Sequence, residues 1–151
     1  MGNNQKEEIK PLSSKEYDAI GEALFELING YPRLPEGVKL DYQSIDGINH
    51  IGFFTAPDGK YLFESVTGGF EAQLSFDIMY KCSATSNGQR LRAEEFLNDI
   101  AEYLSEKPYP SLTAGRTIEK ISMNSTTYRS KAEEDGSVTY VRSGMLKYEK
   151  D

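Results

Sequence analysis

Between Ser14 and Asn29, apolar residues recur every three or four positions, a spacing that predicts an amphipathic helix with one buried face. Ser13 and Glu16 have the spacing of a capping box. In this motif the hydroxyl accepts a hydrogen bond from the N3 backbone N–H, and the carboxylate accepts one from the N-cap backbone N–H. Asn29-Gly30 suits the end of a helix, where a residue in the left-handed backbone conformation stops it. We therefore expect a helix that starts at Ser14. Its apolar face comprises Tyr17, Ile20, Leu24, Leu27 and Ile28.

Three short segments after this helix are strand candidates. Residues 38–44 alternate apolar and polar side chains, as in a half-buried strand, and two further runs cover residues 50–56 and 60–66. The last two runs are joined by Pro-Asp-Gly at residues 57–59, where proline restricts φ and glycine accepts a positive φ. We therefore expect a turn at this tripeptide and a hairpin formed by the two runs.

The segment from Phe70 to Ala84 has the clearest pattern in the chain. Its even-numbered residues are apolar or aromatic, whereas the odd-numbered ones are mostly polar, which predicts a strand with one buried face. Such a strand would span roughly 50 Å at about 3.4 Å per residue, and strands usually have only about five or six residues. We expect it to bend or to project beyond the core, and a projecting strand is a common assembly device.

A second amphipathic helix is expected between Gly88 and Lys107. Asn87 is a suitable N-cap, and Pro108 ends the segment. The apolar stripe of this helix consists of Leu91, Phe96, Leu97, Ile100, Ala101 and Leu104.

The remainder of the chain predicts two long strands joined by an acidic turn. In the first strand, residues 117–130, the apolar register slips between Ile118 and Ile121, so we expect a β-bulge there. Residues 132–137 form the turn, and the last strand contains Gly144. The apolar positions of that strand are Val138, Tyr140, Leu146 and Tyr148.

The order of these elements predicts an α+β fold. The helices are too few to connect parallel strands by crossovers, so neighbouring strands are expected to be antiparallel. We expect a twisted, mainly antiparallel sheet of long strands with two main helices packed on one face. Residues 13–151 are expected to form this single domain, and residues 1–12 a flexible N-terminal tail.

Composition and charge narrow the classes of function. The chain has 151 residues, a formal net charge of -7 and a mean hydropathy of -0.58, and its first residues contain no apolar signal or anchor segment. An acidic chain is poorly suited to gripping nucleic-acid phosphates. A single His and a single Cys make a zinc site, a disulfide framework or a Cys-His pair hard to build. We expect no cofactor, no metal, no membrane and no sequence-specific nucleic acid as partners.

Individual candidates for catalytic chemistry are weak. His50 has no second histidine as a partner, and Cys82 lies on the apolar face of the long strand, where a thiol acts as a small hydrophobe. The carboxylate runs 94–95 and 133–135 fall on the polar side of the second helix and on the acidic turn. Neither place has the burial that raises a carboxylate pKa. We therefore predict no catalytic residue.

Two features favour a protein that assembles with others. The chain has 10 tyrosines and 7 phenylalanines, more than one small core needs, so some must lie at a surface or an interface. Arginine serves polar interfaces well, but arginines also simply solubilise a surface, and the sequence leaves both interpretations open. The candidates for subunit or partner contacts are Arg90, Arg92, Arg116, Arg129, Arg142, Glu133, Glu134 and Asp135.

These segments together resemble a known family. The run FEAQLSFDIMYKCSATSNGQRLRAEEFLNDIAEYL, which begins at Phe70, places a long amphipathic strand before an arginine-bearing helix. From Tyr109 it is followed by YPSLTAGRTIEKIS and a final hairpin. Over about Tyr61 to Lys150 the chain resembles the minor capsid or tail-terminator (tail completion) proteins of long-tailed bacteriophages and prophages of Gram-positive bacteria.

The resemblance implies a structural protein without catalysis. In that family, six copies of a small α+β domain form a ring that caps the tail tube, stops its polymerisation and provides the surface onto which the head docks. The implied partners are further copies, the tail-tube protein and the head-tail connector, and the implied locations are the virion tail and, during assembly, the bacterial host cytoplasm. Two alternatives stay open: a head-side connector or minor capsid component, and a small-molecule enzyme, which would need a buried titratable pair that we could not find in the sequence.

Overall fold

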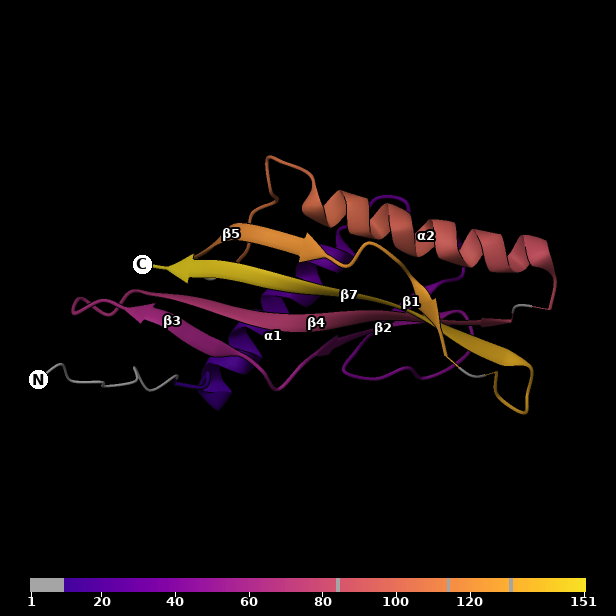
Figure 1. Cartoon of the computed structure of the whole chain (residues 1–151), viewed down its shortest axis with the longest axis horizontal. Coiled ribbons are helices and arrows are strands. Elements are labelled where there is room, and N and C mark those ends of the chain that lie inside the picture. The colour runs from indigo at the N-terminus through magenta and orange to yellow at the C-terminus, as the bar shows by residue number, and fades with distance from the viewer. Residues whose placement is uncertain (1–9, 84, 114, 131) are drawn as a thin grey trace, which may run out of the picture.

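The computed structural model of the chain describes residues 10–83, 85–113, 115–130 and 132–151. These residues form two helices and a seven-stranded mixed sheet, which confirms the expected α+β class (Figure 1). The elements are α1 (Ser14–Asn29), β1 (Lys39–Tyr42), β2 (His50–Thr55), β3 (Lys60–Glu64), β4 (Phe70–Ser83), α2 (Asn87–Ser105), β5 (Arg116–Met123), β6 (Tyr128–Arg129) and β7 (Ser137–Lys150). The strand order β1-β2-β4-β7-β5 leaves the sheet open.

Two long antiparallel strands form the centre of the sheet. β4 and β7 each have 14 residues and pair along their whole lengths, from Phe70 opposite Lys150 to Ser83 opposite Ser137. This β4–β7 ribbon runs along the long axis of the molecule (Figure 1). The predicted long strand is therefore unbroken. Its buried residues are Ala72, Leu74, Phe76, Ile78 and Cys82, which all lie on the even-numbered face.

Two shorter strands lie end to end along the outer edge of β4. β2 pairs with residues 76–81 and β3 with residues 70–73, both antiparallel, so they share the edge that β7 does not occupy. The predicted hairpin of these two segments is therefore wrong. The turn at residues 57–59 carries the chain across a gap in the pairing, where Asp58 Oδ1 accepts a 2.9 Å hydrogen bond from the Ser75 backbone N–H. β1 pairs with β2 in parallel, which makes the sheet mixed.

The edge of β7 has a similar arrangement. β5 and β6 pair one after the other with β7, so the predicted strand 117–130 is divided at residues 124–127. The predicted bulge is present, since the register of β5 shifts between Ile118 and Lys120. The turn that joins β6 to β7 is acidic, as expected. Each long central strand is thus flanked by two short ones.

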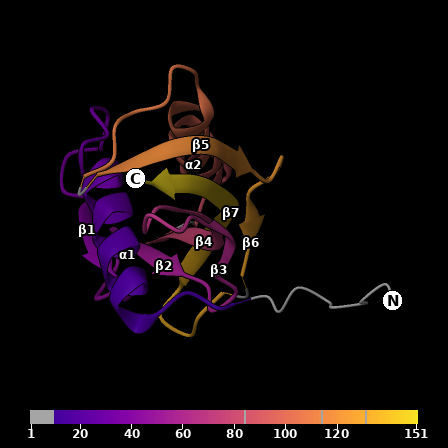
Figure 2. The same ribbon diagram turned by 90° about the vertical axis from the view of Figure 1, so that its left-hand side faces the viewer.

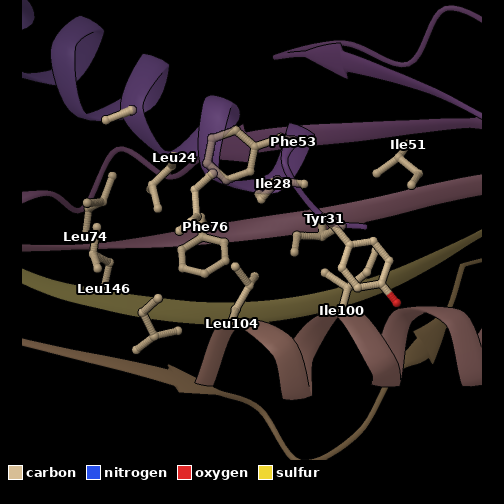
Figure 3. Packing of buried hydrophobic residues seen from close by; sticks show 14 of the residues in the cluster. Leu24, Ile28, Tyr31, Ile51, Phe53, Leu74, Phe76, Ile100, Leu104 and Leu146 are labelled. Atoms are coloured by element: carbon tan, nitrogen blue, oxygen red, sulfur yellow. The ribbon is translucent and has the colours of Figure 1, made fainter. Parts of the chain in front are cut away.

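Both helices pack on the same face of the sheet, as the sequence predicted. Figure 3 shows Leu24 and Ile28 of α1 on one side of Phe76, and Ile100 and Leu104 of α2 on the other. All of these residues belong to one hydrophobic cluster. Seen along the long axis, the strands curve around this cluster rather than forming a flat layer (Figure 2).

The start of α2 differs from the prediction. Its N-cap is Ser86 rather than Asn87: the Ser86 hydroxyl accepts the Gln89 N–H at 3.2 Å, and the Gln89 side chain accepts the Ser86 N–H. Leu91 is 59% exposed. It comes six residues before the buried Leu97, and this spacing places the two side chains about 120° apart around the helix. Neither helix in the described part of the chain is long and apolar enough to cross a membrane.

The predicted N-terminal tail, residues 1–12, lies mostly outside the described residues. Its last three residues run beside the start of β3. The Tyr61 N–H donates to the Lys10 carbonyl at 2.9 Å, and the Leu12 N–H donates to the Gly59 carbonyl at 3.0 Å. Because the Leu12 side chain is also buried, residues 10–12 are part of the folded domain.

Candidate functional site

The residues predicted to contact partners fall into a buried and an exposed group. Arg116 and Arg142 are buried, with 7% and 9% of their surface exposed. The exposed group comprises Arg90, Arg92, Arg129, Glu133, Glu134 and Asp135. The buried arginines need an explanation from within the fold, since few of their atoms face solvent.

Arg116 is held inside the fold by a carboxylate of α1. Its Nε donates to Glu16 Oε2 at 2.8 Å, its Nη2 donates to Glu16 Oε1, and the Tyr148 hydroxyl donates to Glu16 Oε2 at 2.7 Å. The hydrogen bond with Glu16 raises the pKa of Arg116, and burial raises the pKa of Tyr148. An intramolecular ion pair therefore accounts for Arg116 without a partner protein.

The same contact corrects the predicted capping box of α1. Ser13 Oγ accepts the Glu16 backbone N–H at 3.1 Å, as expected. The Glu16 carboxylate, however, binds Arg116 in the interior. Half of the predicted capping box is thus present, and its acidic residue instead forms a buried ion pair.

Arg142 is buried without a carboxylate. It lies on the helix-facing side of β7, where its Nη1 donates to Asn98 Oδ1 of α2 and, at 3.3 Å, to Thr127 Oγ1. Its Nε is buried and has no acceptor among the described residues. Burial lowers the pKa of Arg142. A buried donor without an acceptor costs roughly 1–3 kcal/mol, so this arrangement needs a reason.

Arg142 lines a groove between α2 and the segment that separates β5 from β6. We call it the Arg142 groove; its volume is about 640 Å³, and its walls include Asn98 and Glu102 of α2 and Ser125. The end of β5 and residues 124–125, where the pairing with β7 is interrupted, form the opposite wall. The division of the predicted strand therefore shapes the groove.

Two of the exposed arginines meet near the start of α2. Arg90 of α2 and Arg129 of β6 line one groove of about 640 Å³, together with Thr85 and Ser130. Arg92 faces a separate hollow of about 310 Å³. The structure thus brings together two of the predicted arginines and places the third elsewhere on α2.

The acidic turn, residues 133–135, lies at this same end of the ribbon. The Glu133 N–H donates to the Ser137 carbonyl at 2.8 Å, and Gly136 follows with a φ of 83°. Hydrogen bonds from the Ser137 hydroxyl and N–H lower the pKa of Asp135. Glu133 and Glu134 are exposed, and their carboxylates form no hydrogen bond or ion pair with a described residue, so they are the members of the turn that a partner can reach.

The opposite end of the ribbon exposes apolar side chains that sequence reasoning missed. In the β3–β4 hairpin, Leu62, Phe63 and Val66 are 40%, 59% and 105% exposed. Figure 1 shows this hairpin extending beyond both helices. A signal was available, because the adjacent Leu62 and Phe63 break the strand alternation and cannot both face the core.

A carboxylate pair on the helix-free face was also missed. Lys147 Nζ of β7 lies 3.4 Å from Glu119 of β5 and 4.0 Å from Glu71 of β4. A hydrogen bond with Glu119 is the main cause that raises the pKa of Glu71. The sequence carries no signal for this pair, since only the pairing of both strands with β7 brings the two carboxylates together.

His50 and Cys82 have structural environments of the kind expected. His50 Nδ1 lies 2.7 Å from Asp41 Oδ2. Burial raises the pKa of Asp41, but hydrogen bonds from the Asp46 N–H and from His50 outweigh this effect, so the net shift is downward. Cys82 is a buried free thiol, and burial raises its pKa.

Comparison with known proteins adds no family. Among residues 10–151 apart from 84, 114 and 131, no three His, Cys, Asp or Glu side chains are grouped as ligands for a metal ion. No protein-family model matches the chain, and no curated protein matches it. The candidate surfaces are the apolar and charged ends of the β4–β7 ribbon and the Arg142 groove.

Proposed function

We propose that this chain is a structural protein of the tail-terminator type, which forms a ring with copies of itself, caps the tail tube and provides the surface for head-tail joining. The observation that carries the proposal is the β4–β7 ribbon, whose two ends present different chemistry. A head-to-tail contact joins two different patches and generates a ring when the rotation closes. A long element with unlike ends supports that kind of contact.

The apolar end supplies the hydrophobic part of such an interface. Phe63 and Val66 stand on a projecting hairpin, where monomeric proteins rarely keep clustered apolar side chains exposed. Burying one such side chain contributes about 1.5–3 kcal/mol. A partner that covers both residues therefore gains part of the free energy that offsets the cost of association.

The charged end supplies specificity. Arg90 and Arg129 share a groove beside the acidic turn, so both signs of charge stand close together. Complementary charges at an interface mainly set orientation and exclude wrong partners. This pattern fits a subunit that must join its neighbours in one register.

Tube polymerisation tests the proposal. The purified chain is added to the polymerising tail-tube protein encoded in the same genome, and tube lengths are measured by negative-stain electron microscopy. We expect shorter tubes with a ring at one end, because an occupied growing end cannot add subunits. Tubes of unchanged length with bare ends contradict the proposal, and rings found only on connector assemblies favour the head-side alternative.

A matched pair of variants tests the apolar end. F63S/V66S removes the exposed apolar surface of the hairpin, whereas L91S removes an apolar side chain of α2 that is as exposed as Phe63, at 59%. We expect F63S/V66S to abolish capping and L91S to retain it. Equal capping by the two variants rules out a specific role for the hairpin.

A further inference from the structure

The Arg142 groove contains a cation whose hydrogen-bonding capacity is only partly used. The guanidinium donates through Nη1 to Asn98 and Thr127, whereas the buried Nε has no acceptor among the described residues. Arg142 is only 9% exposed, yet it lines an open groove of about 640 Å³. A guanidinium has a fixed fork of donors that matches the two oxygens of a carboxylate.

Arg116 of the same fold shows this arrangement completed. Its Nε and Nη2 donate to the two oxygens of Glu16, and this contact raises the pKa of Arg116. Arg142 has no carboxylate beside it: its Nε is sealed in the interior without an acceptor, its Nη2 forms no hydrogen bond with a described residue, and burial lowers its pKa. The contrast between the two buried arginines points to an acidic group supplied from outside the chain.

We infer that the Arg142 groove binds a carboxylate from the acidic turn, residues 133–135, of a second copy of this chain. Glu133 and Glu134 are exposed on a projecting turn, and their carboxylates form no hydrogen bond or ion pair with another described residue. The turn of the same copy cannot serve, because Ser137 and Arg142 are roughly 17 Å apart along β7 at about 3.4 Å per residue. Figure 1 shows that turn at the end of the ribbon.

The groove and the turn are different patches, so this contact is head-to-tail and can repeat from copy to copy. The inference deepens the proposed function, on which it rests for its biological setting, by naming one contact between neighbouring copies. Glu102 also lines the groove and opposes an incoming carboxylate. The variant E102Q is therefore expected to tighten the association.

Self-association of the purified full chain tests the inference. Sedimentation velocity over a concentration series gives the dissociation constant, and ¹⁵N NMR of the arginine Nε–H groups reports on Arg142 directly. We expect the Arg142 Nε resonance to shift as the concentration rises. Because E133Q/E134Q removes the charge from both charge-assisted hydrogen-bond acceptors, we expect it to weaken the association about tenfold or more.

The control is E94Q/E95Q, which removes two adjacent exposed carboxylates of α2 and changes the net charge by the same amount. We expect it to leave the dissociation constant within about threefold, as for other exposed charges. Two results overturn the inference: equal weakening by both double variants, or a wild-type chain that stays monomeric at about 1 mM. Tube capping is measured separately, so failure of the contact and failure of the proposed function are distinguishable.

Discussion

Replacing Glu16 by Gln tests the structural role of the buried ion pair. Gln keeps the shape of the side chain but removes the negative charge that Arg116 contacts through Nε and Nη2. Both side chains are almost fully buried, at 6% and 8% side-chain exposure for Arg116 and Glu16. The guanidinium would then remain in the interior as an uncompensated charge.

The expected magnitude follows from this burial. Breaking a buried ion pair by removing one partner costs about 3–5 kcal/mol, and domains of this kind have total stabilities of about 5–15 kcal/mol. Y148F removes only the 2.7 Å hydrogen bond from the hydroxyl to Glu16 and is expected to cost about 1.5–3 kcal/mol. The predicted order of stability is therefore wild type, then Y148F, then E16Q.

Urea unfolding followed by circular dichroism measures these differences. The matched control is E22Q, which makes the same chemical change on the exposed side of the same helix. We expect E22Q to stay within about 0.5 kcal/mol of wild type. If E16Q loses no more stability than E22Q, the ion pair has no structural role.

Three further predictions concern other parts of the fold. Gly144→Ala is expected to destabilise the core by about 1–3 kcal/mol in urea unfolding, since a Cβ there would lie 2.5 Å from Met123 Sδ; unchanged stability would contradict this packing. Asp58→Ala is expected to cost about 1–2 kcal/mol in the same assay, because the Ser75 N–H loses its acceptor, and no loss would refute the account of the interrupted pairing. The lowered pKa of Asp41 means that its ionised form stabilises the fold above its ordinary pKa of 3.8 and that this stabilisation is lost as the pH falls through the lowered value. The stability difference between wild type and D41N should therefore shrink in acid, and a constant difference would exclude this linkage.

Periodicity alone predicted which face of each long element is buried. The alternation in β4 and the stripe of α1 are local properties of the chain, and a local pattern suffices to tell an inward side chain from an outward one. The bulge in β5 was predictable for the same reason, because the apolar register itself slips there.

Strand neighbours were not predictable from these patterns. Alternation tells which face of a strand is buried but carries no information about which edge it pairs with. The sequence therefore predicted that β2 and β3 form a hairpin. In the structure both pair with β4, which is long enough to hold them along one edge. The hydrogen bond from Ser75 to Asp58 supports the gap between them, and that contact exists only in the folded sheet.

The candidate contact residues show the same division. The acidic turn was predicted as an exposed turn because glycine and consecutive carboxylates mark such a turn on local grounds. The Glu71–Glu119 pair was missed because it depends on which strands lie next to each other. The exposed apolar hairpin was missed although the broken alternation at Leu62 and Phe63 signalled it.

Local patterns predicted most of the elements, most of their buried faces and the polarity of the turns, because these depend on neighbours within a few positions. Tertiary structure decided the roles of two arginines that look alike in the sequence. Arg116 meets the carboxylate of Glu16 from 100 positions away, whereas Arg142 meets only the neutral Asn98 and Thr127. The role of a buried arginine depends on which groups are buried beside it. Those groups come from distant segments of the chain, so they are known only once these segments have packed together.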